Sequence, residues 1–171
     1  AYERRIDRAL RLRLASVEDA AADLPQRLNR LFDQPAPDGV IDWQKLACAL
    51  ATRGAFSIVT GGPGTGKTTT VVRLLALLQA PAVESGSPLR IRLAAPTGKA
   101  AARLTESISQ QVLSLTVPDN VREKIPTQVT TVHRLLGSRP GTRHFRHHPG
   151  NPLPLDVLVV DNPKRVIPSG L

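Results

Sequence analysis

The sequence predicts an α/β fold, a doubly wound parallel sheet with flanking helices, preceded by a short helical segment. Three observations favour this fold. Strand-like apolar segments alternate with helix-like segments between residues 55 and 160. The segment LDVLVV (155–160) is continuously apolar and β-branched, which is typical of a strand buried on both faces of a parallel sheet. The glycine-rich segment GGPGTGKT (61–68) joins a predicted strand to a predicted helix. Such alternation indicates helices packed on a parallel sheet.

Two helices are expected before the sheet begins. Residues 4–17 have an apolar stripe at helical spacing, surrounded by arginines. A second short helix is expected around 25–32, because Pro25 suits a first helical turn. The segment QPAPDG (34–39) has the composition of a linker, and we expect a domain boundary there.

The elements of the sheet region follow in order. Asp42 is expected to cap a helix over WQKLACALAT (43–52), because its carboxylate can accept from the free amides of the first turn. The next expected elements are a strand AFSIVT (55–60), a helix TTTVVRLLALLQ (68–79), a strand LRIRLAA (89–95) and a helix over 98–115. After them come a polar loop over 117–128 that could include a turn of helix, a helix TVHRLL (131–136) capped by Thr130 or Thr131, an irregular loop over 139–154 and the strand 155–160.

Composition narrows the function classes. The 171 residues suit one domain, with 41% apolar and 22% charged residues. No apolar run reaches the roughly 20 residues that cross a bilayer, and the single cysteine fits a reducing compartment, so we expect a cytoplasmic protein. The 23 Lys and Arg against 14 Asp and Glu give a net charge of +9, which favours a polyanionic partner such as nucleic acid.

The segment 61–68 fits the phosphate-binding pattern G-x-x-x-x-G-K-[ST]. Glycines let the backbone amides turn toward phosphate oxygens, and the helix that follows adds its positive end. Lys67 would supply charge to the β- and γ-phosphates, and Thr68 a hydroxyl to Mg²⁺. Asp161, directly after the strand 155–160, is the best second residue for the metal. At this point kinase, GTPase, transport ATPase and helicase functions all fit.

Segments between these two sites carry a resemblance. LAAPTGKAAARLTES (93–107) and TVHRLLG (131–137), between GGPGTGKTTT and LDVLVVD, resemble the ordered motifs of superfamily 1 DNA helicases. Most closely they resemble the RecD family, the alpha subunits of exodeoxyribonuclease V (RecBCD). The similarity covers roughly residues 42–161.

The resemblance implies a RecA-like P-loop NTPase fold and a helicase function. Residues 39–161 would be the ATP-binding motor domain, residues 1–38 the helical tail of a preceding domain, and 162–171 a tail of unclear origin. ATP and Mg²⁺ would be the cofactors. ATP-driven 5′ to 3′ movement would take place on single-stranded DNA, with partner subunits of a RecBCD-like complex, in double-strand-break repair and recombination. The protein would be located in the bacterial cytosol and would not bind a membrane.

Site residues are carried over position by position. Lys67 and Asp161 would be catalytic, and Thr68 and Asp161 would hold Mg²⁺. The residues expected to bind ATP are Gln44, which would read adenine, and Gly61, Gly62, Pro63, Gly64, Thr65, Gly66, Lys67, Thr68 and Thr69. Those expected to bind DNA are Pro96, Thr97, Gly98, Lys99, Thr131 and His133.

The sequence also departs from the family. Asn162 stands where the family has a glutamate, and the general-base assistance of that acid, worth roughly 10²–10⁴ in rate, would be absent. Because the later helicase motifs would lie beyond residue 171, we expect a fragment that binds ATP and DNA but does not unwind alone. Two other functions stay open: a small P-loop kinase, and a non-catalytic module that binds DNA or a partner. His144, His147 and His148 lack the cysteines or acids of a typical zinc site, and RHFRHH is as well explained by an exposed basic face.

Overall fold

The computed structural model describes residues 2–17, 19, 21–33, 39–62, 64–138, 141 and 144–161. The chain forms two compact units. The first comprises the described residues of 1–88 and 111–125, and the second those of 89–110 and 126–161. Each unit is described in turn.

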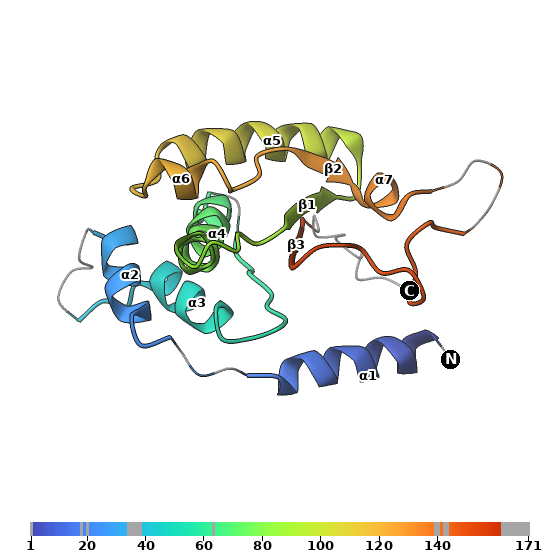
Figure 1. Ribbon diagram of the computed structural model, residues 1–171, viewed down its shortest axis with the longest axis horizontal. Helices are drawn as coiled ribbons and strands as arrows, with labels where there is room; N and C mark the ends of the chain where they lie inside the picture. The colour runs from blue at the N-terminus through green and yellow to red at the C-terminus, as the bar shows by residue number, and fades with distance from the viewer. Residues whose placement is uncertain are drawn as a thin grey trace. The chain divides into compact units, whose positions relative to one another are not determined.

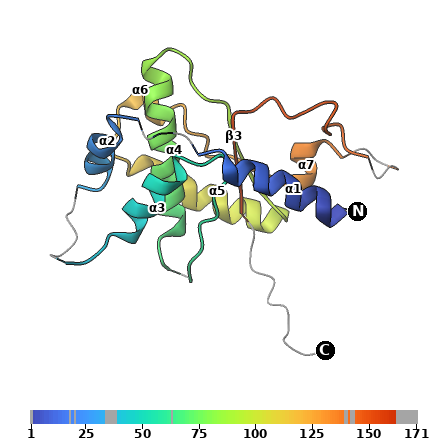
Figure 2. The ribbon, with the colours of Figure 1, turned by 90° about the horizontal axis from the view of Figure 1, so that it is seen from below.

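The first unit is helical. It contains α1 (Tyr2–Ala15), α2 (Leu24–Leu31), α3 (Trp43–Ala51), α4 (Lys67–Glu84) and α6 (Asp119–Arg122). Figures 1 and 2 show α2 and α3 beside α4, and all three pairs among these helices are in contact. The side chains most deeply buried in this unit are Cys48, Val72, Leu75, Ala76, Gln79 and Val121. The long helix α4 therefore forms the centre of the unit.

Local chemistry explains where these helices begin. Asp42 caps α3, because its carboxylate accepts from the amide of Lys45 at 3.0 Å, as the sequence predicts. Gly66 precedes α4 with φ +75°, a left-handed conformation that glycine adopts without strain. Helix α4 extends past the predicted end at residue 79 and continues through Pro81 to Glu84.

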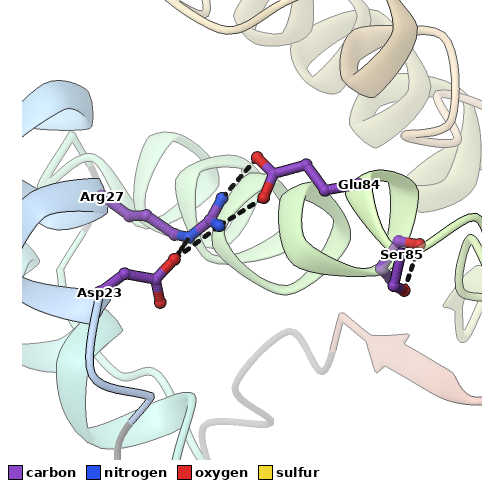
Figure 3. Close-up of polar contacts among 5 residues, drawn as sticks. Asp23, Arg27, Glu84 and Ser85 are labelled. Carbon is purple, nitrogen blue, oxygen red and sulfur yellow. Dashed lines mark hydrogen bonds and ion pairs between the residues drawn. The ribbon is translucent and has the colours of Figure 1, made fainter.

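An ion pair ties α2 to the end of α4. Figure 3 shows the guanidinium of Arg27 between two carboxylates, Asp23 at 2.6 Å and Glu84 at 2.5 Å. Hydrogen bonds from Arg27 lower the pKa of both acids. Beside Glu84, the hydroxyl of Ser85 donates to the main-chain oxygen of Ala82 and closes the last turn of α4.

The second unit contains a small parallel sheet. Strands β1 (Ile91–Ala95), β2 (Val129–Thr131) and β3 (Val157–Val160) have the order β2-β1-β3, and both pairs are parallel. Helix α5 (Gly98–Leu113) follows β1, with its last three residues assigned to the first unit, and α7 (Val132–Leu136) follows β2. The parallel sheet confirms the predicted α/β fold class.

The segment after α7 folds back on that helix. Gly137 ends α7 with φ +69°, and its main-chain oxygen accepts from the amide of Arg146. Ser138 and Phe145 form an isolated antiparallel bridge, and the Phe145 ring lies 6.0 Å from the ring of His133. The described part of the predicted irregular loop is thus attached to α7.

Two predictions about strands are wrong. Residues 55–60 form no strand, and Ile58 is 74% exposed. A strand is stabilised by a ladder of hydrogen bonds to a neighbouring strand. In the described part of the chain this segment joins no sheet, and the single bond from the amide of Ala55 to the main-chain oxygen of Ser16, at 3.4 Å, makes no ladder. In β3, Leu158 and Val160 are 41% and 49% exposed, and Val157 and Val159 are only half-buried, so the predicted burial on both faces is wrong.

The expected boundary at 34–39 falls largely outside the described residues, and the predicted domain limits stay predictions. In the part of the chain that the structure describes, no helix has the length and apolar character to span a membrane.

Candidate functional site

The glycine-rich loop is closed by its own side chains. The hydroxyl of Thr65 donates to the main-chain oxygen of Gly62 at 2.8 Å. Gly64 and Gly66 have φ values of +72° and +75°, which other residues adopt only with strain. A Cβ added to Gly61 would meet the Thr65 hydroxyl. The loop backbone therefore depends on glycine at the positions that the sequence predicts.

Lys67 bends back over this loop. Its ammonium donates to the main-chain oxygens of Gly61 at 2.9 Å and Gly62 at 2.5 Å. The same residue begins α4, whose first amides have no partner within the helix. A positive charge and a helix N-terminus thus lie at the same end of the loop. This combination suits phosphate oxygens, which form stronger hydrogen bonds with an ammonium than neutral carbonyls do.

Gln44 reaches the loop from α3. Its amide nitrogen donates to the main-chain oxygen of Thr65 at 3.3 Å. The same nitrogen lies where a side chain at position 66 would begin, which adds a second reason for glycine there. The structure thus brings Gln44 into contact with the glycine-rich loop, although 21 positions separate Gln44 from Thr65 in the sequence. Pro63 lies outside the described residues.

The two hydroxyls after Lys67 differ in their surroundings. Thr69 donates to the side-chain oxygen of Gln111 at 2.9 Å, so its hydroxyl is committed to packing in the first unit. Thr68 is half-buried in the first turn of α4. Its hydroxyl oxygen is a ligand type that Mg²⁺ accepts.

One residue of this region was missed by sequence reasoning. Arg73 of α4 donates to the side-chain oxygen of Gln44 at 3.4 Å and lies over the ring of Phe32. A signal was present, because Arg73 is the one charged residue in the apolar run VVRLLALL. Its partners could not be read from the sequence.

In the second unit, the predicted residues gather at the carboxyl edge of the sheet. Pro96–Lys99 follow β1, Thr131 ends β2, and Asp161 follows β3. The register places Ala95 opposite Thr131 and Ala94 opposite Val160. In open parallel sheets, ligands bind at this edge, where the strand order reverses. Here the order β2-β1-β3 puts the reversal between β1 and β3.

Both threonines at this edge have structural partners. The Thr97 hydroxyl accepts from the amide of Ala100 at 3.2 Å, and the Thr131 hydroxyl from the amide of Arg134 at 3.2 Å. They begin α5 and α7 respectively, and Thr131 is one of the two residues, Thr130 or Thr131, that the sequence offers as the cap of α7. Gly98, Lys99 and His133 are exposed. The edge therefore presents a helix N-terminus together with a lysine, a combination that suits a DNA phosphate.

Asp161 is fixed through its backbone. Its amide donates to the main-chain oxygen of Ala94 at 2.9 Å, which extends the β1–β3 ladder by one residue. Its side chain is half-buried. Asn162 and the tail that follows lie outside the described residues.

Two of the three clustered histidines, His147 and His148, contact the backbone of their own turn. His147 contacts the main-chain oxygen of Asn151 through its Nδ1 atom at 3.3 Å, and the Nδ1 atom of His148 accepts from the amide of Gly150. Within the described ranges, no group of three His, Cys, Asp or Glu side chains could hold a metal ion. These ring nitrogens instead stabilise the turn between residues 147 and 151.

Comparison with known proteins decides the family. A family profile described as an AAA domain matches residues 44–167. The RecBCD enzyme subunit RecD of Mycolicibacterium smegmatis is 51% identical over 125 residues, which cover 72% of this chain and 22% of that protein. The RecBCD enzyme subunit RecD of Haemophilus influenzae is 46% identical over 143 residues, 81% of this chain and 22% of that protein. The chain belongs to the RecD family.

A further relative extends the comparison. The ATP-dependent RecD2 DNA helicase of Deinococcus radiodurans is 39% identical over 104 residues, 61% of this chain and 11% of that protein. This RecD-family chain spans about a fifth of the length of the curated RecD relatives it matches. The resemblance to RecD drawn from the sequence is thus confirmed, as is an α/β fold of the P-loop NTPase class.

Proposed function

We propose that this chain is the ATP-binding motor domain of a 5′ to 3′ DNA helicase subunit of the RecD type. Its role would lie in double-strand-break repair and recombination in the bacterial cytosol, together with partner subunits of a RecBCD-like complex. The names of the relatives, which include RecBCD enzyme subunits and an ATP-dependent helicase, support this function. Because the chain spans about a fifth of the RecD relatives, we expect it to bind ATP and DNA without unwinding alone.

The observation that carries the proposal is the position of Lys67. Its ammonium and the N-terminus of α4 converge on a loop whose backbone turns at two glycines with positive φ. A triphosphate would replace the carbonyls of Gly61 and Gly62 as the partner of the ammonium. The exchange is favourable, because the carbonyls are neutral whereas the phosphate oxygens carry negative charge that attracts the ammonium directly.

Magnesium fits the donors that the chain offers. Thr68 would contribute a hydroxyl and Asp161 a carboxylate, both oxygen ligands of the kind that Mg²⁺ prefers. Bound Mg²⁺ would neutralise charge on the β- and γ-phosphates. Asp161 would hold the ion through its carboxylate, and the bond from its amide to the main-chain oxygen of Ala94 fixes its backbone after β3.

DNA is proposed to bind at the carboxyl edge of the sheet in the second unit. Lys99 lies in the first turn of α5, and its side chain is exposed. Lys99 and the free amides of this turn would contact the phosphate backbone, which positions a strand without reading its sequence. His133, exposed on α7, is proposed as a second contact.

Titration of the chain with Mg·ATP tests the nucleotide site. We expect Lys67→Ala to weaken binding by about two orders of magnitude, because it removes a charged partner of the phosphates. Lys124→Ala is the matched control, since it removes an exposed lysine of the same unit. Equal affinities for the unaltered chain and Lys67→Ala would overturn the proposal.

The same preparation distinguishes the other functions. Phosphorylation of a nucleoside or small metabolite would identify a kinase. Salt-dependent DNA binding that neither ATP nor Lys67→Ala affects would identify a non-catalytic module.

A further inference from the structure

The side chain of Arg73 connects the nucleotide loop to the core of the first unit. Its guanidinium carbon lies 4.4 Å from the centroid of the Phe32 ring, and Phe32 is only 6% exposed. Cation–π attraction to a buried ring restricts the guanidinium to one place. Among the described residues, no carboxylate lies within ion-pair distance of Arg73. Its one side-chain hydrogen-bond partner there is the amide of Gln44.

The two contacts of Gln44 fix which way its amide points. A guanidinium can only donate hydrogen bonds and a main-chain oxygen can only accept them. Arg73 therefore requires the amide oxygen, at 3.4 Å, and Thr65 requires the amide nitrogen, at 3.3 Å. The reversed amide would place two donors together and two acceptors together. The orientation thus follows from the partners and does not depend on telling oxygen from nitrogen.

The fixed amide keeps one acceptor and one donor unused. An amide oxygen accepts two hydrogen bonds and an amide nitrogen donates two, and Arg73 and Thr65 occupy one of each. Adenine presents a donor at its 6-amino group beside an acceptor at N7, which matches this pair. Guanine and hypoxanthine present two acceptors there. An amide free to turn over would offer its donor to the 6-oxygen of those bases.

We propose that Arg73 is a positioning residue that holds the Gln44 amide in one orientation and thereby sets the preference for adenine over 6-oxo purine nucleotides. The inference rests on the proposed nucleotide site. Arg73 makes no contact with the nucleotide in this scheme and acts only through Gln44. Phe32, the residue that ends α2, supports Arg73 through its ring.

The test compares three ligands in the presence of Mg²⁺: ATP, ITP and inorganic tripolyphosphate, which has no base. Binding of each is measured for the unaltered chain, Arg73→Ala, Arg73→Lys and the control Arg30→Ala, which removes an exposed arginine of the same unit. Thermal unfolding of each variant reports the integrity of the fold.

We expect Arg73→Ala to lower the ratio of ATP to ITP affinity about tenfold, the effect of one well-placed hydrogen bond. Tripolyphosphate affinity should stay within about twofold, because the loop and Lys67 are unchanged. Arg73→Lys should restore much of the ratio, since an ammonium also donates to the amide oxygen. In a Gln44→Ala background, Arg73→Ala should have no further effect on the ratio.

Other results would overturn the inference. An equal loss for all three ligands would show that Arg73 acts on the loop or by general charge. An unchanged ratio in a folded Arg73→Ala chain would show that the amide needs no positioning. Failure of the nucleotide site itself would give a different result: the unaltered chain and Lys67→Ala would bind tripolyphosphate with equal affinity.

Discussion

Asp156, the residue before β3, accepts three hydrogen bonds from Arg90, the residue before β1. One carboxylate oxygen accepts from the amide of Arg90 at 2.7 Å and from its Nε atom at 3.0 Å, and the other accepts from Nη2 at 2.9 Å. The amide of Asp156 donates to the main-chain oxygen of Arg90 at 2.9 Å. This pair fixes the register that places Asp161 beside the end of β1.

Acid should weaken this register. The Arg90 side chain, followed by the Arg90 amide, lowers the pKa of Asp156 to about 2 from the ordinary 3.8. Because the pKa is depressed in the folded state, the stabilisation is complete above about pH 4 and is lost as pH falls toward 2. Asp156→Asn should remove it at neutral pH. Urea unfolding from pH 2 to 7 should show the difference between the two proteins shrinking below pH 4.

Asp7→Asn is the control for this experiment. Asp7 pairs with Arg11 on the surface of α1, where both side chains are more than half exposed. Such pairs contribute little to stability, so this variant should unfold like the unaltered chain. A difference for Asp156→Asn that does not change with pH would contradict the prediction.

Gly66→Ala should disturb the loop in two ways. A residue other than glycine at φ +75° costs about 1–2 kcal/mol, and the new Cβ would meet the Gln44 amide. We expect lower stability in urea together with lost nucleotide affinity. Gly86→Ala is the matched control, because Gly86 has φ +78° and open space around it. That variant should lose stability but keep its affinity for nucleotide.

Gln79→Ala should destabilise the first unit by about 2–3 kcal/mol. Gln79 is 0% exposed, and its amide nitrogen donates to the main-chain oxygen of Lys124 at 2.8 Å. Its loss leaves a cavity in α4 and weakens the attachment of the segment after α6. Urea unfolding measures the change. Gln110→Ala, on an exposed position of α5, should have little effect.

The thiol of Cys48 should be unreactive in the folded chain. Burial, the largest cause, raises its pKa to about 12 from 9.0, and its Sγ atom contacts the main-chain oxygen of Thr70. At pH 8 the buried thiol is therefore almost entirely protonated, and alkylation requires the thiolate. Iodoacetamide should therefore label the chain in urea but not in buffer. Rapid labelling without denaturant would indicate that α3 and α4 are not packed as described.

Lys99→Ala should reduce the salt dependence of DNA binding. Loss of one phosphate contact on single-stranded DNA lowers the slope of log affinity against log salt concentration by about 0.7. The Lys124→Ala variant serves as the charge-matched comparison. Parallel slopes for Lys99→Ala and the unaltered chain would place the DNA elsewhere.

Local signals made some features predictable. The cap Asp42 is predicted correctly, and Thr131 is one of the two candidates predicted for α7, because capping involves residues only three positions apart. The glycines of the loop are predicted by the local spacing of the pattern G-x-x-x-x-G-K-[ST]. The parallel direction of β1 and β3 was expected from the alternation of strands and helices, whereas the strand order was not predicted.

Features that depend on distant partners were not predictable. Segment 55–60 has the composition of a strand, but composition does not supply the neighbouring strand that its backbone needs. Strand β2 is too short and polar to stand out, and is formed by pairing with Leu93 and the two residues after it. Arg73 meets an amide 29 positions away. The placement of site residues relative to the metal and DNA stays a prediction.

The assignment of residues to the two units has a consequence for how the chain is made. Residues 111–125 return to the first unit after 89–110 have begun the second. A ribosome must therefore synthesise past residue 125 before the first unit has all its parts, including the Lys124 carbonyl that Gln79 binds. No single cut separates the units, because the chain passes between them three times. An expression fragment that ends at residue 88 would leave the buried side of α4 without its cover, and should aggregate.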